Sequence, residues 1–215
     1  MRTTSDDRAR TTFTQRKRRD QLVDCAIDAI AELGFNRASV GEIARRAGVS
    51  KGVVNYHFAA KDDLIREVVA HIFDSVTAFL ESRLGATSPS RFVADYVTAW
   101  VAYYRTHPGY MIAIREIWTN FRDEGGQLQF GGQAVADELA VVQHVLELGQ
   151  ADGSRGAFSA RVMAVTMKAA LEALLAQFAD DPDLDLEAYG SELVGLFERA
   201  TRPASSKSES EKRRT

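Results

Sequence analysis

Apolar residues recur at steps of three and four along most of the chain, which is the spacing of one face of an amphipathic helix. The first such series runs from Gln15 to Leu33, and Gly34 follows it as a stop signal. Its apolar members are Leu22, Val23, Ala26, Ile27, Ile30 and Leu33. No stretch alternates with the period of two that marks a strand. The pattern therefore predicts an all-α protein.

Two short helices follow the first one in the predicted order. Ser39 and Glu42 have the S-x-x-E spacing of a capping box, which satisfies free backbone donors at the start of a helix. A second helix is therefore expected over about 40–47, with Gly48 as its stop and Ser50 as the cap of a third helix. Short helices joined by a turn of about three or four residues form a helix-turn-helix.

Further predicted helices reach almost to the end of the chain. They cover about 61–84, 89–106, 110–122, 133–149, 159–179 and 185–200. The segment "DEGGQLQFGG" is expected to be a flexible break, and "PASSKSESEKRRT" has too few apolar residues to fold. The predicted division is a flexible basic arm over 1–14, a helix-turn-helix domain over 15–60, a helical body over 61–202 and a disordered tail over 203–215.

Charge is distributed unevenly between these parts. Residues 1–60 hold 11 Lys and Arg against 7 Asp and Glu, whereas residues 61–203 hold 12 against 21. A basic head on an acidic body suggests that the head meets a polyanion. A chance split of surface charge gives the same figures, so a binding role for the head needs support from its residues.

The composition narrows the class of protein. A chain of 215 residues with 45% apolar content is long enough to bury a core. Its N-terminus lacks the apolar segment of a secretory signal, and no run of about 18 apolar residues predicts a membrane span. We therefore expect a cytoplasmic protein without a membrane partner. Its single cysteine, Cys25, permits no intrachain disulfide and is expected to be an ordinary helix residue.

The sequence contains no complete metal-binding or cofactor-binding motif. The acidic segment from Asp181 to Glu192 places carboxylates at positions 1, 3, 5 and 12 of a calcium loop, but Leu186 occupies the position that requires glycine. A solvated acidic loop that caps the last helix is the simpler interpretation. The four histidines have no metal-ligand spacing. The sequence therefore predicts neither a metal nor a cofactor.

The third predicted helix carries more polar side chains than packing requires. Val54 and Phe58 are expected to pack inward. Gly52 lets the start of the helix approach a neighbouring surface such as a sugar-phosphate backbone. The exposed face offers Ser50, Lys51, Asn55, Tyr56 and His57, on a helix slim enough for the DNA major groove. This face predicts a double-stranded DNA partner.

Residues 16–64 resemble the DNA-binding domain of the tetracycline-repressor (TetR) family of bacterial regulators. The resemblance rests on "AELGFNRASV", on "IARRAGVSKGVVNYHF" and on "KDDL", which supply glycine, serine, aromatic and lysine positions in the family's order. It implies an N-terminal helix-turn-helix domain of three helices and a C-terminal helical domain that binds an effector and forms a dimer. Asn55 departs from the family's pattern, since many members have a tyrosine there.

The resemblance also implies which residues touch DNA. Lys61 is expected to clamp a phosphate with its ammonium and a backbone donor at the start of the fourth helix. Arg45, Arg46 and the run 16–19 are expected to add attraction that does not depend on sequence, unless they are solvated surface charges. The predicted contact set is Arg45, Arg46, Ser50, Lys51, Gly52, Val53, Asn55, Tyr56, His57 and Lys61.

A homodimer is expected because one helix-turn-helix covers too few base pairs for specific binding, and dimers present two such helices to half-sites about 34–36 Å apart. The last two predicted helices suit a four-helix interface between two copies. The predicted interface residues are Val162, Val165, Ala169, Ala173, Leu186, Tyr189, Leu193, Leu196 and Phe197. An ordinary monomer core explains the same apolar pattern.

Rings gather in the middle of the chain, where the resemblance implies an effector pocket. Indole and hydroxyl groups on rings favour an apolar or cationic small molecule. The predicted lining residues are Trp100, Tyr103, Tyr104, His107, Met111, Ile114, Trp118, Phe121, His144, Met163 and Met167. A packed core is the alternative interpretation of this aromatic stripe.

These observations predict a ligand-responsive transcriptional regulator rather than an enzyme. The expected mechanism is a repressor that a small molecule releases from a palindromic operator. The glycines of "EGGQLQFGG" lack the GK[ST] of a phosphate loop, and no GxSxG elbow is present. Two alternatives stay open at this point: a TetR-like helical dimer that acts through protein partners without an operator, and an all-helical enzyme without a recognised motif.

Overall fold

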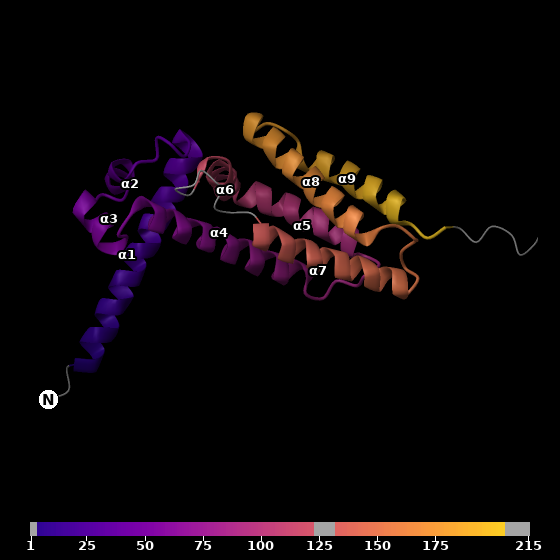
Figure 1. The fold of residues 1–215 in the computed structure, drawn as a ribbon, viewed down its shortest axis with the longest axis horizontal. Helices are drawn as coiled ribbons and strands as arrows, with labels where there is room; N and C mark the ends of the chain where they lie inside the picture. Colours follow the sequence, from indigo (N-terminus) through magenta and orange to yellow (C-terminus); the bar gives the residue numbers. More distant parts are fainter. Residues whose placement is uncertain (1–3, 123–131, 205–215) are drawn as a thin grey trace, which may run out of the picture. The chain divides into compact units, whose positions relative to one another are not determined.

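The structure is a computed structural model. It describes the backbone of residues 4–122 and 132–204 and the side chains of residues 14–122 and 135–204. Within them the chain forms nine α-helices (Figure 1). They are α1 (Thr4–Leu33), α2 (Val40–Arg46), α3 (Lys51–His57), α4 (Lys61–Leu84), α5 (Phe92–Thr106), α6 (Pro108–Asn120), α7 (Gly132–Ala151), α8 (Ala160–Asp180) and α9 (Leu186–Thr201). The all-α prediction is confirmed.

The largest difference from the predicted boundaries lies at the start of the chain. The first helix begins at Thr4 rather than Gln15, so the backbone of residues 4–14 continues the helix where a flexible arm was expected. A helix that is already anchored extends at little cost through polar residues, because each added residue gains a backbone hydrogen bond. The predicted break over 123–132 and the predicted tail fall largely outside the described residues.

The first of two compact units comprises residues up to Ala78 together with the segment from His107. In it, α1 packs against α2 and α6, and α2 packs against α3. Gly34 adopts φ 79° just after α1, a left-handed conformation that glycine tolerates best. The next residue, Phe35, donates its backbone N–H to the carboxylate of Glu116 on α6 at 3.1 Å. The sixth helix is therefore part of the same unit as α1–α3. The predicted domain boundary at residue 60 stays a prediction.

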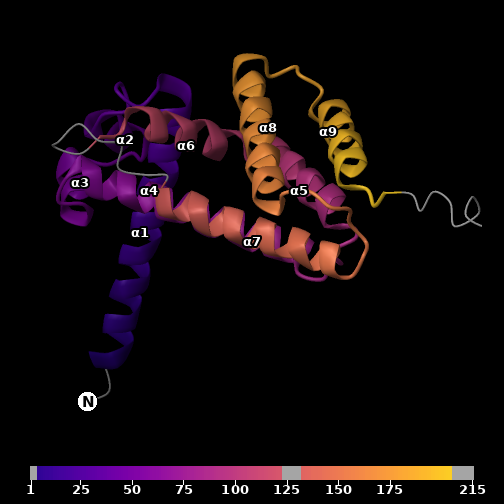
Figure 2. The ribbon, with the colours of Figure 1, turned by 45° about the vertical axis from the view of Figure 1, so that its right-hand side comes forward.

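The second unit comprises residues 79–106 and those from 132 onward. Its helix α5 lies beside both α8 and α9, and α7 packs against α8 (Figure 2). Tyr103 on α5 and Met167 on α8 are fully buried in it. Gly190 lets α9 approach α5 closely, because a Cβ there would come within 2.8 Å of the Val101 side chain.

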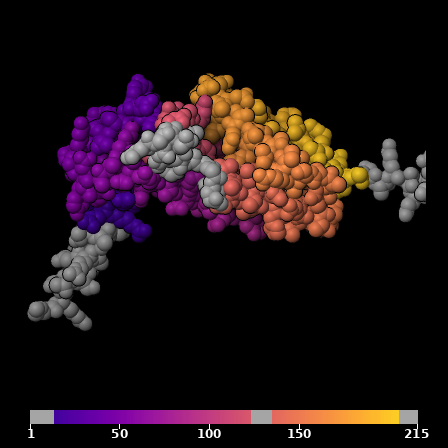
Figure 3. Space-filling model, viewed as in Figure 1, coloured from indigo at the N-terminus to yellow at the C-terminus, as the bar shows by residue number. Residues whose placement is uncertain are grey.

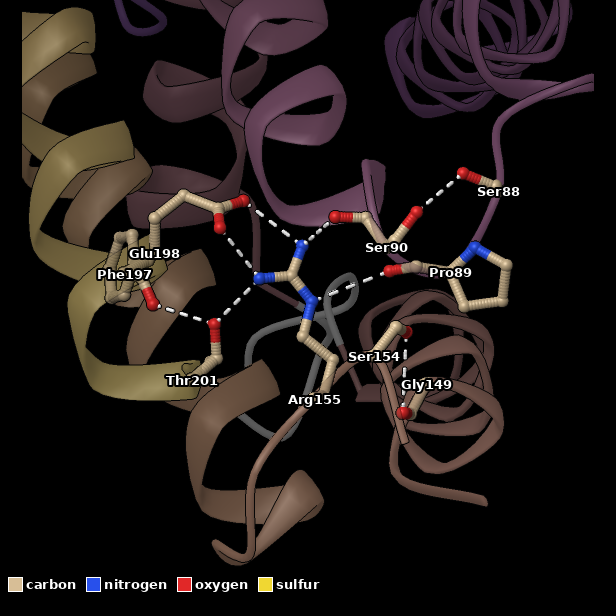
Figure 4. Close-up of polar contacts among 9 residues, drawn as sticks. All are labelled: Ser88, Pro89, Ser90, Gly149, Ser154, Arg155, Phe197, Glu198 and Thr201. Atoms are coloured by element: carbon tan, nitrogen blue, oxygen red, sulfur yellow. Dashed lines mark hydrogen bonds and ion pairs between the residues drawn. The ribbon is translucent and has the colours of Figure 1, made fainter. Parts of the chain in front are cut away.

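A buried arginine joins three segments of this second unit (Figure 4). Arg155, in the loop between α7 and α8, has a side chain that is 2% exposed. Its guanidinium donates to both carboxylate oxygens of Glu198 at 2.8 and 3.0 Å and to the Thr201 hydroxyl at 2.9 Å. It also donates to the backbone carbonyls of Pro89 and Ser90. One side chain thus fastens the end of α9 to the segment that precedes α5.

Helix α8 combines a buried and an exposed apolar face. Leu171 and Leu174 lie in the core of the second unit, whereas Val162 and Val165 are 62% and 44% exposed. In the space-filling view α8 (orange) and α9 (yellow) present adjoining surface (Figure 3). Among the described helices, α8 alone is long and apolar enough by length and composition to cross a membrane, a property that core helices of globular proteins share.

Candidate functional site

Helices α2 and α3 form the predicted helix-turn-helix. The Ser39 hydroxyl accepts a hydrogen bond from the Glu42 backbone N–H at 3.2 Å, so the first half of the expected capping box is present. The Glu42 carboxylate instead accepts bonds from Arg45 and Arg46. Ser50 occupies the N-cap position of α3 without a side-chain capping bond, which leaves its hydroxyl uncommitted to the helix.

The turn between the two helices owes its shape to a glycine and a small residue. Gly48 has φ 67°, a left-handed conformation that strains most other residues. The Val49 backbone N–H then bonds to the Ala44 carbonyl at 2.9 Å and returns the chain to the core. Val54 and Phe58 are 1% and 3% exposed, which confirms that this face of α3 packs inward.

The opposite face of α3 is open to solvent. Tyr56 is 72% exposed, and Lys51, Gly52 and Asn55 are also exposed. The Tyr56 hydroxyl accepts a hydrogen bond from Gln15 on α1 at 3.2 Å. Because the buried Val54 packs the opposite face of α3 into the core, the polar side chains of the exposed face are held in a defined position.

Two members of the predicted contact set on α3 are half-buried. Val53 and His57 sit at the edges of the exposed face. Burial, followed by the nearby charges of Arg19 and Arg18, lowers the pKa of His57 below its ordinary 6.5. The imidazole is therefore neutral at pH 7 and offers hydrogen bonds rather than a charge.

Arg45 and Arg46 differ although they are adjacent. The Arg46 side chain is 17% exposed and joins Glu32 of α1 at 2.7 Å and Glu42 at 2.9 Å. Its guanidinium thus ties α2 to α1. Arg45 is 71% exposed and pairs only locally, with Glu42 at 2.7 Å, so it keeps a solvent-facing charge.

The ammonium of Lys61 lies inside the first unit. It donates to the Phe35 carbonyl at 3.0 Å and stands 4.6 Å from the centroid of the Phe35 ring. Burial lowers its pKa below the ordinary 10.5. The prediction that Lys61 clamps a phosphate remains a prediction, and it requires the ammonium to leave Phe35.

Arg19 has a role that the sequence did not reveal. The predicted non-specific attraction of residues 16–19 to DNA requires the charge of Arg19 to face solvent. In the structure the Arg19 guanidinium instead bonds to Glu67 on α4 and to the His57 carbonyl. Arg16 and Lys17, by contrast, are exposed. Helical periodicity places Arg19 near the core edge, but no local pattern identifies a partner 48 residues away.

The predicted effector-lining residues divide between the two units. In the second unit Trp100, Tyr103, Tyr104 and Met167 are buried, Met163 is half-buried and His144 is exposed. In the first unit Met111, Ile114 and Phe121 are buried, whereas His107 and Trp118 are half-buried. His144 therefore differs from the expectation, because it faces solvent from α7 rather than the interior of its unit. The single pocket that would unite the set stays a prediction.

A polar cluster surrounds Trp100 within the second unit. The Glu138 carboxylate accepts a hydrogen bond from the Tyr96 hydroxyl at 2.7 Å and pairs with the Lys168 ammonium at 2.8 Å. That ammonium lies 5.7 Å from the centroid of the Trp100 ring. The indole N–H of Trp100 is buried and has no acceptor within hydrogen-bond geometry, although its approach to the Tyr96 hydroxyl acts to lower the pKa of that phenol. No local pattern in the sequence identifies Glu138 or Lys168, because their partners lie on other helices, 42 residues away for Tyr96 and Glu138.

Burial governs the titration of the phenols in this cluster. It raises the pKa of Tyr96 well above 10.0, and the Glu138 carboxylate raises that pKa further. Burial likewise raises the pKa of Tyr104. Both hydroxyls are therefore neutral donors at pH 7. No group of three or more potential metal ligands is present among the residues with described side chains.

The predicted dimer residues fall into exposed and buried groups. Val162, Val165, Ala169, Ala173 and Leu196 are exposed on α8 and α9, and Tyr189 and Leu193 are half-buried. Leu186 and Phe197 differ from the expectation, since they are 6% and 2% exposed within the protomer. Their side of α9 is covered because the helix packs on α5 and α8. The exposed group remains available to a second copy.

Comparison with known proteins adds a family match. Residues 22–68 match the model of bacterial regulatory proteins of the tetR family. The HTH-type transcriptional regulator BetI of Escherichia coli O17:K52:H18 (strain UMN026 / ExPEC) is 34% identical over 104 residues, which are 40% of this chain and 53% of that protein. The protein of the same name from Cronobacter sakazakii is 36% identical over 81 residues, 36% of this chain and 40% of its own length. The matches thus span about half or less of these relatives.

Solved structures match over more of the chain. A TetR-family regulator structure from Rhodococcus sp. has a TM-score of 0.74 at 22% identity, over 85% of this chain and 98% of its own. A transcriptional regulator FadR from Bacillus subtilis, solved in complex with stearoyl-CoA, has a TM-score of 0.68 at 17% identity, over 82% of this chain and 96% of its own. These likenesses show that the fold extends beyond the matched N-terminal segment.

Proposed function

Since this chain belongs to the TetR family of bacterial regulatory proteins, we propose that it binds a palindromic DNA operator as a homodimer and represses transcription until a small molecule releases it. The observation that carries the proposal is the outer face of α3. This face exposes Lys51, Asn55 and Tyr56 on a helix that is fixed from behind by Val54. The residues suit the task, because recognition helices read base edges in the major groove with such side chains.

The side chains on this face divide between two kinds of contact. Lys51 and the hydroxyls of Ser50 and Tyr56 suit phosphate oxygens, which position a protein on DNA without reading its sequence. Asn55 suits a base edge, since an amide can bond bidentately to adenine in the major groove. The neutral His57 adds a hydrogen bond rather than a counterion.

The dimer contact belongs to the exposed apolar residues of α8 and α9. Val162, Val165 and Leu196 are each at least 44% exposed, and a group of exposed apolar side chains is typical of an interaction surface. Ala169 and Ala173 continue the same side of α8 with small side chains that allow close approach. A second copy meeting this face in two-fold symmetry gives a four-helix contact.

The effector site belongs to the cluster around Trp100. An aromatic face beside a carboxylate suits a cation, and here the Lys168 ammonium already occupies that place. The buried indole N–H of Trp100 offers a further bond to an acceptor on the effector. We assign to the effector an apolar body with a cationic group that competes with Lys168.

Release from DNA requires coupling between the effector site and α3. Helix α4 begins at Lys61 in the first unit and ends at Leu84 in the second, so one continuous helix belongs to both. An effector that displaces this helix would alter the spacing of the two recognition helices in the dimer. A coupling of about 1 to 3 kcal/mol weakens operator binding by about 5- to 150-fold.

Fluorescence anisotropy of the purified protein tests the DNA-binding part. The probes are the DNA flanking the protein's own gene, a scrambled duplex, and duplexes selected from a random pool. We expect tight, salt-dependent binding with a preference for one sequence. Asn55→Ala should reduce that preference, while Lys51→Ala should weaken binding to all sequences and lower the salt slope by about one. Absence of preference in the selected pool would favour a dimer that acts through protein partners or an unrecognised enzyme.

Two serines provide a matched pair for the same assay. Ser39→Ala should lower stability by about 1 kcal/mol, because it removes the cap of α2. Ser50→Ala should leave stability nearly unchanged and weaken DNA binding, because its hydroxyl makes no cap in α3. Thermal melting and anisotropy on both variants separate the two roles. A Ser50 variant that binds DNA like the wild type would remove this residue from the contact set.

The chemistry of the effector is tested with compounds that carry a trimethylammonium group and with uncharged analogues of the same shape. We expect the cations alone to raise the melting temperature and to weaken operator binding. Lys168→Met should strengthen this response by removing the internal competitor, and Glu138→Gln should abolish it. Equal responses to cations and uncharged analogues would assign the site to apolar effectors instead.

A further inference from the structure

Arg19 lies between α3 and α4, the helices that the proposed release mechanism requires to move together. Three of its nitrogens are engaged within the first unit: Nη1 with the His57 carbonyl at 2.9 Å, and Nε and Nη2 with the Glu67 carboxylate at 3.2 and 2.8 Å. The residue itself belongs to α1. A single guanidinium therefore touches the end of α3 and the side of α4 from a third helix.

The bond to His57 satisfies a need that α3 cannot meet itself. The last four carbonyls of any α-helix lack an intrahelical donor, and in a helix of seven residues they are a large share of the backbone. His57 is the final residue of α3, and Arg19 donates to its carbonyl. The guanidinium also stands 4.4 Å from the centroid of the ring of Phe58, the residue at the C-cap position of α3. A cation at this end also complements the negative end of the helix dipole.

The bond to Glu67 is a two-point contact with a defined geometry. The planar fork of arginine meets both carboxylate oxygens at once, which fixes orientation as well as distance. The Arg19 and Glu67 side chains are 38% and 42% exposed, so water screens the pair and its contribution to global stability is small. Geometry rather than stability is therefore what this contact provides.

We propose that Arg19 is a positioning residue that links α4 to the recognition helix, so that a displacement of α4 at Glu67 moves the His57 end of α3. The proposal rests on the proposed function, because it assigns α3 to the DNA groove and α4 to the transmission of the effector signal. The competing role is that of a simple counterion for phosphate. Arg16, three residues earlier on the same helix and exposed, is the matched control for charge.

The first test measures binding of the full-length protein to its selected operator and to a scrambled duplex. Arg19→Ala should weaken operator binding about tenfold more than scrambled binding, within the range of couplings between groups in contact. Arg16→Ala should weaken both duplexes by the same small factor. Arg19→Lys, which keeps the charge but loses the fork, should resemble Arg19→Ala.

Glu67→Gln provides the decisive comparison. Loss of a negative charge beside the DNA-binding face should strengthen binding to every duplex if charge alone matters. A positioning role predicts the opposite for the operator, which should bind about tenfold more weakly, as neighbouring coupled groups do. Combining Glu67→Gln with Arg19→Ala should then add little to either single change. Stronger operator binding by Glu67→Gln, with Arg19→Ala behaving like Arg16→Ala, would overturn the proposal.

Hydrogen exchange on the protein without DNA provides a readout that does not depend on the proposed function. Arg19→Ala should speed exchange of the Phe58 amide, which bonds to the Val54 carbonyl at 2.9 Å at the end of α3, whereas Arg16→Ala should not. Faster exchange together with no sequence-preferring binding by the wild type would refute the proposed function and retain the link. Unchanged exchange in Arg19→Ala would refute the link itself.

Discussion

Arg19 and Arg155 make the same kinds of bond in two regions that differ in exposure. Each guanidinium joins a glutamate on one helix to backbone at the boundary of another element, through one carbonyl for Arg19 and two for Arg155. The Arg19 side chain is 38% exposed, whereas that of Arg155 is 2% exposed. The same arginine–carboxylate contact can therefore serve two purposes, since exposure to water determines how much stability is lost when the contact breaks.

Near the surface, a guanidinium that leaves its partners is hydrated at once. The Arg19 link can therefore break and form again during function without endangering the fold. In the interior, removal of Arg155 would take a donor from Glu198, from two backbone carbonyls and from the Thr201 hydroxyl, which keeps only its own bond to the Phe197 carbonyl. The first contact suits a moving part of the protein, and the second suits a fixed one.

Among the variants that test this comparison, Arg155→Ala should show the largest loss of stability. Loss of the buried guanidinium should lower the free energy of unfolding by about 3 kcal/mol, the lower end for broken buried pairs, because Glu198 is 34% exposed. Chemical denaturation of the variant and the wild type measures the change. Arg161→Ala, an exposed arginine on α8, is the control and should stay within about 0.5 kcal/mol. Similar losses for Arg155→Ala and Arg19→Ala would show that exposure does not separate the two contacts.

Gly190→Ala tests how tightly α9 is held beside the buried arginine. Its new Cβ would come within 2.8 Å of the Val101 side chain on α5, so we expect a loss of about 1 to 3 kcal/mol from overpacking. Gly195→Ala on the same helix is the control, because its Cβ would meet only the flexible tip of Arg199 at 3.2 Å. That variant should be neutral or gain about 0.5 to 1 kcal/mol from helix propensity. A stable Gly190 variant, measured by denaturation, would mean that α9 shifts easily and that Arg155 does not fix it.

The sequence predicted the helices well because their signals are local. Gly48 and Ser39 mark the turn and the start of α2 by their own backbone preferences, and the structure has both. Val54 and Phe58 could be assigned to the core from helical periodicity alone. Local chemistry therefore accounts for the existence and order of the elements in the first unit.

The partners of charged residues could not be predicted, because they depend on packing between distant segments. Arg19 meets Glu67 48 residues away, Arg155 meets Glu198 43 residues away, and neither pair has a spacing that a sequence pattern reports. The same limit explains why the sequence predicts neither the bond from Lys61 to the Phe35 carbonyl, 26 residues away, nor the exposure of His144 to solvent. Helical periodicity likewise leaves open which side of α9 packs inside the protomer, which is why it predicts a dimer contact for Leu186 and Phe197 although both are buried.

The smallest expected effect concerns Glu42, whose arginine partners are local. Hydrogen bonds from Arg45 and then Arg46 lower its pKa from 4.5 to about 2. A carboxyl with a depressed pKa in the folded state stabilises the protein above its ordinary pKa, and that stabilisation is lost as the pH falls toward the folded value. The melting temperatures of the wild type and Glu42→Gln should therefore differ at pH 5 and converge as the pH approaches about 2. Titration of the Glu42 carboxyl by NMR measures the pKa directly. A midpoint near 4.5 would mean that neither arginine pair of Glu42 is maintained in solution, even though the Arg46 and Glu42 side chains are only 17% and 21% exposed.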